Sequence, residues 1–196
     1  MLLPLPPGNF QAYLFDCDGT ITDSMPLHYQ AWTTTLAQWG CEFPEDLFYA
    51  WGGRPAVDIV ADLNARYGLA MPVAAVADQR EAVFQAGLGT VRAVPGVLEH
   101  IEEAYRRVPF AVVSGSTRDS VTTSLTALGL LDRFPVLVCA EDYARPKPDP
   151  EGYLTAARLV GVDPEKCLVF EDTELGVQAA EAAGMACVKV PAPWER

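Results

Sequence analysis

Two aspartates one residue apart, directly after a short apolar run, constrain this chain more than any other feature. The stretch AYLFDCDGT places Asp16 and Asp18 just after the apolar residues 12–15. Two carboxylates about 4 Å apart repel by ~1 kcal/mol in water and by ~4 kcal/mol at an effective dielectric near 20. A chain that ends a buried strand on two acids therefore needs positive charge there, from its own side chains or from a metal ion.

Five short apolar runs have the length and composition of buried parallel strands. They span residues 12–15, 110–114, 135–140, 167–170 and 187–190. Helical patterns lie between the later runs, and Gly129, Gly161 and Gly184 stand where three of these helices would end. This alternation predicts an α/β layered domain with a parallel sheet.

The segment between the first and second apolar runs breaks this rhythm. It contains helical patterns at residues 25–40, 55–68 and 72–87 and no convincing strand. We therefore predict an all-helical cap over residues 25–91. The α/β catalytic core would be formed by residues 1–24 and 92–196.

Charge and composition exclude several partner classes. The 196 residues contain 14 Lys and Arg against 26 Asp and Glu, a formal net charge of −12 that would repel nucleic acid and anionic membranes. The proline-broken start MLLPLPPGNF fits neither a signal peptide nor a membrane span. Five widely spread cysteines predict reduced, buried thiols. We expect a cytoplasmic monomer that binds neither nucleic acid nor membrane.

Polar side chains gather where the predicted strands end, which is where open α/β sheets bind ligands. The set comprises Asp16, Asp18, Ser114, Gly115, Ser116, Lys147, Glu171 and Asp172. Several carboxylates with open positions suit Mg²⁺, and Lys147 can pair with a carboxylate and with a bound phosphoryl group. The sequence therefore predicts a site for Mg²⁺ and for a small phosphorylated metabolite.

The paired aspartates suit phosphoryl transfer in two steps. Asp16 can attack phosphorus to form an aspartyl phosphate, and Asp18 can protonate the leaving group and later deprotonate a water. Gly19 lets the chain turn past the acids, and Thr20 is small enough to sit beside a phosphate. Each residue also has a structural interpretation, since Asp-Gly is a common turn and Ser114 or Asp172 could cap a helix. Capping and catalysis are compatible.

Four motifs, in order and spacing, resemble those of the haloacid dehalogenase superfamily of phosphohydrolases. They read DCDGT, VVSGS, RPKPDP and VFEDTELGVQAAEAAG. The stretch DGTITDSMPLHYQAW, followed by a helical insert, is similar to the β-phosphoglucomutase-like group, which has a helical cap. The resemblance implies a doubly wound Rossmann-like parallel sheet of order 5-4-1-2-3. It also implies a Mg²⁺-dependent phosphatase, with a sugar phosphate as the expected substrate.

The resemblance also implies individual roles. Asp16 would be the nucleophile and a Mg²⁺ ligand, and Asp18 the general acid/base that also binds the metal through its backbone carbonyl. Asp172 would ligate Mg²⁺, with Glu171 assisting directly or through water. The phosphoryl group would be held by Ser114, Gly115, Thr20 and Lys147.

Cap residues leave open which substrate is taken and whether the enzyme is a hydrolase or a mutase. His28 is a candidate contact on the substrate side, and Arg54, Gln79 and Arg80 could line its far end. The mutases place an arginine where this chain has Ala56. That departure favours a phosphatase over a phosphosugar mutase. A phospho-receiver domain, which also combines acids, a lysine and Mg²⁺, has no place for the helical insert.

Overall fold

The apolar runs form a single parallel sheet at the centre of the core. The computed structural model describes residues 3–195. The strands are β1 Ala12–Phe15, β2 Phe110–Val113, β3 Val136–Val138, β4 Cys167–Glu171 and β5 Ala186–Lys189. All four neighbouring pairs are parallel, in the order β3-β2-β1-β4-β5. This is the predicted order 5-4-1-2-3 read from the other edge, so the predicted fold class is confirmed.

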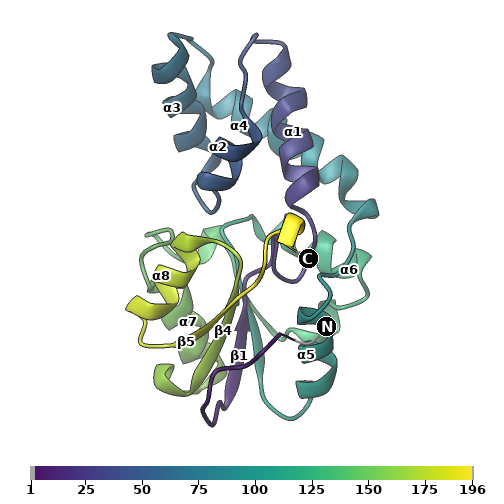
Figure 1. Ribbon diagram of the computed structural model, residues 1–196, viewed down its shortest axis with the longest axis vertical. Helices are drawn as coiled ribbons and strands as arrows, with labels where there is room; N and C mark the ends of the chain where they lie inside the picture. The colour runs from purple at the N-terminus through teal and green to yellow at the C-terminus, as the bar shows by residue number, and fades with distance from the viewer. Residues whose placement is uncertain (1–2, 196) are drawn as a thin grey trace.

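Helices cover both faces of this sheet (Figure 1). They are α5 Val97–Ala104, α6 Arg118–Ala127, α7 Glu151–Val160 and α8 Glu174–Ala182. Neighbouring residues of β1 point to opposite faces. Phe15 packs in the cluster that contains α5 and α6 residues, whereas Leu14 packs with residues of α7 and α8. The sheet is therefore doubly wound and buried on both sides.

Four helices form a separate layer above the carboxyl ends of the strands (Figure 1). They are α1 Met25–Ala37, α2 Glu45–Ala50, α3 Ala56–Tyr67 and α4 Val73–Gly87. Trp32, Phe48, Val60 and Leu63 share an apolar cluster of their own. All four helices lie within residues 25–91, and the exact boundaries of cap and core stay a prediction.

Two local differences from the sequence-based expectation have simple causes. β3 stops at Val138, short of the predicted residue 140, because the Cys139 N–H donates to the Asp142 carboxylate (2.7 Å) instead of continuing the ladder. The helix α2 was not predicted, since six residues are too few for helical periodicity to show. The predicted helix ends at Gly129, Gly161 and Gly184 are confirmed, because all three glycines have positive φ.

Candidate active site

The sheet order places three polar strand ends side by side. β1 lies between β2 and β4, so Asp16 after β1 has Ser114 on one side and Glu171 on the other. All three residues are nearly or fully inaccessible to solvent. The tertiary structure therefore brings these motif residues together at one edge of the sheet, as the sequence predicted.

Lys147 is the cation at the centre of this edge. Its Nζ donates to Asp16 Oδ1 (2.7 Å) and to Glu171 Oε1 (2.6 Å), and also to the backbone carbonyl of Val113 (3.3 Å). Burial alone would lower the pKa of Lys147, but the carboxylates of Asp16 and Glu171 hold that pKa well above its usual value. The lysine is therefore a fixed positive charge beside the predicted nucleophile.

Three carboxylates lie close enough to share one metal ion. Asp16, Glu171 and Asp172 each offer an oxygen, and these oxygens lie within 4.8 Å of one another. Burial raises the pKa of Asp172 to about 7, with the charge of Glu171 adding to the shift, and burial likewise raises the pKa of Asp16. Buried acids of this kind are relieved by a cation, and an all-oxygen donor set suits a hard ion such as Mg²⁺.

Two glycines leave the room that this acidic cluster occupies. A Cβ at Gly19 would lie 2.1 Å from Asp172 Oδ2, and a Cβ at Gly176 would lie 1.8 Å from Glu171 Oε1. Gly19 also has a positive φ of +86°, which other residues adopt only with strain. The glycines in DCDGT and DTELG therefore bring the backbone directly against the candidate metal ligands.

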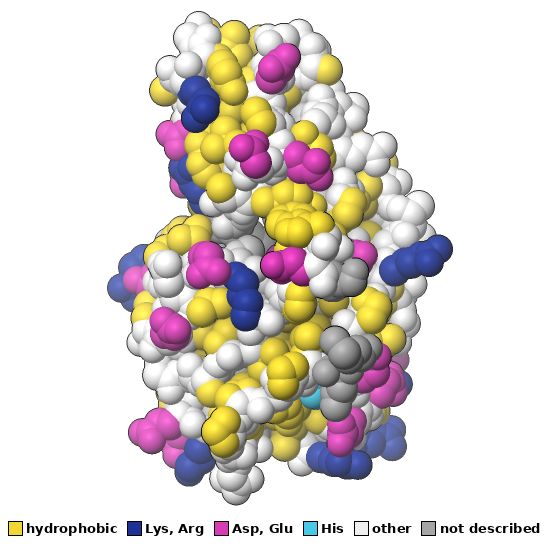
Figure 2. Space-filling view, in the orientation of Figure 1, with side chains coloured by type: hydrophobic (Ala, Val, Ile, Leu, Met, Phe, Trp, Pro, Cys, Tyr) yellow, Lys and Arg dark blue, Asp and Glu magenta, His cyan; other side chains and the backbone are white. Residues whose placement is uncertain are grey.

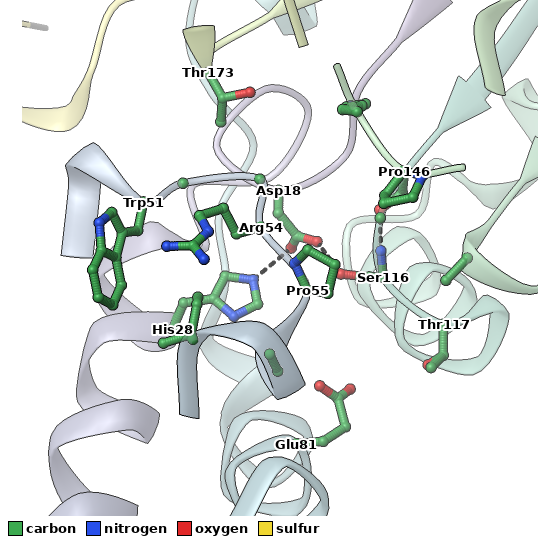
Figure 3. A pocket seen from close by; sticks show the side chains of 18 of the residues that line it. Asp18, His28, Trp51, Arg54, Pro55, Glu81, Ser116, Thr117, Pro146 and Thr173 are labelled. Atoms are coloured by element: carbon green, nitrogen blue, oxygen red, sulfur yellow. Dashed lines mark hydrogen bonds and ion pairs between the residues drawn. The ribbon is translucent and has the colours of Figure 1, made fainter. Parts of the chain in front are cut away.

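Asp18 points away from the acidic cluster and toward hydroxyl donors. Its carboxylate accepts hydrogen bonds from Ser116 Oγ (2.7 Å) and Ser24 Oγ (2.8 Å), and His28 Nε2 lies 3.1 Å from it (Figure 3). Burial alone would raise the pKa of Asp18, but the His28 ring and the two serine hydroxyls together bring it well below its usual range. Its side chain is therefore ionised, and its expected backbone contact with a metal stays a prediction.

The residues predicted to bind phosphate occupy two different positions. Ser114 and Gly115 line the cavity beside Lys147, whereas Thr20 is buried and donates from Oγ1 to Asp172 Oδ1 (3.3 Å). Sequence reasoning missed Tyr143, whose hydroxyl donates to the Ser114 carbonyl (2.9 Å). A single tyrosine in a loop carries no spacing signal that could have pointed to it.

A cavity of about 480 Å³ lies between these strand ends and the cap. Figure 2 shows the waist of the molecule where the two layers meet. The volume falls within the range of small-molecule sites, about 300–1,000 Å³. Trp51 and Arg54, from the loop between α2 and α3, face this cavity together with His28 (Figure 3).

A chain of polar contacts connects the cap with the core. His28 Nδ1 contacts Arg80, the Arg80 guanidinium pairs with Glu81 (2.8 Å), and Glu81 accepts a hydrogen bond from Ser120 of α6. Burial and the charge of Arg80 lower the pKa of His28 despite the carboxylate of Asp18. Both His28 and Arg80 line the cavity, although the sequence had left the position of Arg80 open.

Other cap candidates fall in different places. Arg54 lines the cavity and pairs with Asp62 (2.6 Å), with its guanidinium 4.7 Å from the centre of the Trp51 ring. Gln79 is exposed and contacts Gln38 (2.6 Å), and it is absent from the residues that line the cavity in the described part of the chain. The sequence pattern could not separate these residues, because it does not show which side of α4 faces the site.

Sequence comparison connects the chain with phosphatases. It is 35% identical over 189 residues to the validoxylamine A 7'-phosphate phosphatase of Streptomyces hygroscopicus subsp. limoneus, covering 91% of this chain and 84% of that protein. It is 34% identical over 183 residues to the fructose-1-phosphate phosphatase YqaB of Escherichia coli, covering 93% and 97%.

Solved structures share the fold. CbbY from Rhodobacter sphaeroides, solved with phosphate, superposes with a TM-score of 0.81 at 25% identity, over 91% of this chain and 84% of that one. A mutant of the same protein, solved with Xylulose-(1,5)bisphosphate, gives the same values. A family model for haloacid dehalogenase-like hydrolases matches residues 10–184. The chain therefore belongs to the haloacid dehalogenase-like hydrolase family, as its four motifs indicated.

Proposed function

We propose that this protein is a Mg²⁺-dependent phosphatase that hydrolyses a small sugar phosphate through an aspartyl-phosphate intermediate. The observation that carries the proposal is the placement of Asp16, which faces the cavity, contacts Lys147 (2.7 Å) and shares a possible metal position with Glu171 and Asp172. The two phosphatase relatives support the same reaction class.

The reaction divides into two displacements at phosphorus. An oxygen of Asp16 bonds to phosphorus while the bond from phosphorus to the sugar oxygen breaks, and that oxygen takes a proton from Asp18. Asp18 then removes a proton from water, whose oxygen attacks the aspartyl phosphate and releases inorganic phosphate. The donors around Asp18 favour its ionised form, which is the form that the second step requires. The proton that Asp18 removes from water in the second step is the one that it gives to the sugar oxygen in the next turnover, so Asp18 alternates between its ionised and protonated forms.

Binding of the phosphoryl group is assigned to residues that surround Asp16. Ser114 and Gly115 present hydroxyl and backbone donors from the end of β2, and Lys147 supplies positive charge. Thr20 contributes indirectly, because its hydroxyl donates a hydrogen bond to Asp172. His28 and Arg54 would contact the part of the substrate that lies toward the cap.

The residues present fit a magnesium ion at this edge. Asp16 and Asp172 would hold it, with Glu171 assisting and the Asp18 backbone carbonyl as a further ligand. When bound, Mg²⁺ would neutralise charge on the phosphoryl oxygens. Lys147 donates to two of these candidate ligands, Asp16 and Glu171, and so orients both carboxylates beside the metal position.

A phosphate-release screen tests the proposal. Hexose, pentose, glycerol and glycolate phosphates and a generic aryl phosphate are incubated with Mg²⁺ and with a chelator. We expect Mg²⁺-dependent phosphate release that Asp16→Asn abolishes while the circular dichroism spectrum is unchanged. Substantial activity of the Asn variant would remove Asp16 as nucleophile. Formation of glucose 6-phosphate from glucose 1-phosphate without phosphate release would indicate a mutase instead.

We also expect the enzyme to act as a cytoplasmic monomer. All five cysteines are free thiols, and four of them are buried, which fits a reducing compartment. Among the described residues no helix is long and apolar enough to cross a membrane. Size-exclusion chromatography with light scattering tests the oligomeric state, and a dimer would contradict it.

A further inference from the structure

The cap side of the cavity carries its positive charges in compensated pairs. Arg54 lies 2.6 Å from the carboxylate of Asp62, and Arg80 lies 2.8 Å from the carboxylate of Glu81. Arg54, Arg80 and Glu81 line the cavity, whereas Asp62 of α3 contacts Arg54 without lining the cavity itself. Each guanidinium is therefore balanced by a carboxylate of its own.

A further carboxylate on the same wall has no counterpart. Asp78 of α4 lines the cavity and is exposed, and no hydrogen bond or ion pair joins it to another residue in the described part of the chain. When Asp62, the partner of Arg54 that does not itself line the cavity, is counted with the wall, two arginines meet three carboxylates, Asp62, Asp78 and Glu81. The net charge of the wall is then negative.

The helix backbone of the cap does not make the net charge of this wall positive. The first residues of α3, Pro55 and Ala56, border the cavity, and the N-terminus of a helix carries partial positive charge. Asp58 lies in the first turn of α3 and offsets that charge. The cap therefore has no charge surplus with which to hold a second anion.

A second phosphate on the substrate would have to lie against this wall. Its first phosphate is held at the strand ends by Lys147 and Ser114, so the other end of the molecule extends toward the cap. A phosphate monoester carries a charge of about −1.5 to −2 at pH 7. Like charges brought together across a binding surface weaken the complex. The fold itself allows two phosphates, as the CbbY complex with a bisphosphate demonstrates.

We propose that the cavity selects phosphate monoesters whose far end is uncharged and hydroxylated, and that Asp62 and Asp78 exclude bisphosphates. The inference rests on the proposed function and narrows its substrate to sugar monophosphates. Asp78 accepts hydrogen bonds from sugar hydroxyls. Asp62 acts through Arg54 and is a positioning residue. Because an exposed ion pair contributes little stability, Asp62 acts by balancing the charge of Arg54 and not by the strength of their bond.

Competition experiments measure how a second phosphate at the far end of a sugar affects its binding. Hydrolysis of p-nitrophenyl phosphate is measured with fructose 1-phosphate or fructose 1,6-bisphosphate as competitor, and apparent inhibition constants are compared. For the unmodified protein we expect the monophosphate to bind at least about tenfold more tightly. Asp62→Asn and Asp78→Asn should each tighten bisphosphate binding about fivefold, which is the effect of a unit charge about 8 Å from a phosphate dianion in water.

A matched control and salt dependence make the test specific. Asp163→Asn also frees a cation from an exposed pair, that of Asp163 with Lys166 (3.1 Å), but precedes β4 at the opposite end of the sheet. It should leave both inhibition constants unchanged. The bisphosphate gains should shrink in 0.5 M salt, because screening weakens interactions between exposed charges.

The outcomes distinguish this inference from the proposed function. Absence of p-nitrophenyl phosphate hydrolysis would overturn the proposed function. Hydrolysis with equal binding of the two sugar phosphates, or with binding of neither, would overturn the inference alone. The inference would also fall if the Asp62 and Asp78 variants changed both constants equally, or if Asp163→Asn produced the same gain.

Discussion

The two sides of the cavity differ in how their charged side chains are arranged. At the strand ends, Lys147 faces three clustered carboxylates, Asp16, Glu171 and Asp172, so negative charge is concentrated and buried. On the cap side of the cavity, charges are more exposed, and the two arginines that line the cavity, Arg54 and Arg80, are each paired with a carboxylate. The strand ends therefore favour a cation, whereas the arginines of the cap side are already balanced by carboxylates.

Removing Lys147 from the strand-end side of the cavity should have the largest effect on activity and stability. Lys147→Met leaves Asp16 and Glu171 buried without their cation. We expect phosphatase activity to fall about a thousandfold and the free energy of unfolding to fall by about 3 kcal/mol. Steady-state kinetics and urea unfolding measure the two effects. Lys166→Met removes an exposed, paired lysine and should change neither; unchanged kinetics in Lys147→Met would exclude that residue from the site.

Replacing Gly19, which brings the backbone against the acidic cluster, should have the second-largest effect on activity. Gly19→Ala would push a Cβ into Asp172, so we expect activity to fall about a hundredfold and the Mg²⁺ needed for half-maximal activity to rise. Gly68→Ala is the control, because Gly68 also has a positive φ but nothing lies within 4 Å of its Cβ position. It should lose about 1 kcal/mol of stability and keep its activity. Equal activity losses would mean that backbone strain alone explains both.

Removing the hydrogen bond between Ser120 of the core and Glu81 of the cap should have a smaller effect on activity. Ser120→Ala removes the hydroxyl by which α6 meets Glu81 of the cap, and one hydrogen bond of this kind contributes about 1 kcal/mol. We expect kcat/KM to fall about fivefold, mainly through KM. Ser124→Ala removes another buried hydroxyl of α6 that makes no hydrogen bond to a cap residue among residues 3–195, and its kinetics should match the unmodified protein. A Ser120 variant with unchanged kinetics would show that this contact does not hold the cavity closed.

The smallest expected effect concerns buried groups that burial keeps neutral. Burial raises the pKa values of Cys139 and Cys167 to about 11, against about 8.5 in an unfolded chain. Between these values the unfolded state loses thiol protons that the folded state keeps, so stability falls as pH rises above about 8.5. Each of the two thiols should contribute roughly 1 kcal/mol to the difference between the unfolding free energies measured in urea at pH 7.5 and 9.5. The double variant Cys139→Ala, Cys167→Ala should reduce that difference; an unchanged slope would contradict the assignment.

The contrast between the two sides also separates what could be predicted from what could not. Asp16, Lys147, Glu171 and Asp172 each follow an apolar run or occupy a short motif, and parallel strands bring such positions to one edge. Their gathering therefore followed from local pattern and from the family resemblance. The cap residues had no such constraint, and the sequence left Arg54, Gln79 and Arg80 undecided.

The sequence by itself determined the α/β class, the helical insert and the acids, lysine and serine of the site, because periodicity and motif spacing are local properties of the chain. Only the tertiary structure decided that Asp18 faces Ser116 and His28, that Arg54 is balanced by Asp62, and that Glu81 meets Ser120. These pairs depend on how helices of the cap are rotated and placed against each other and the core. That placement results from packing between distant segments, which no local pattern records.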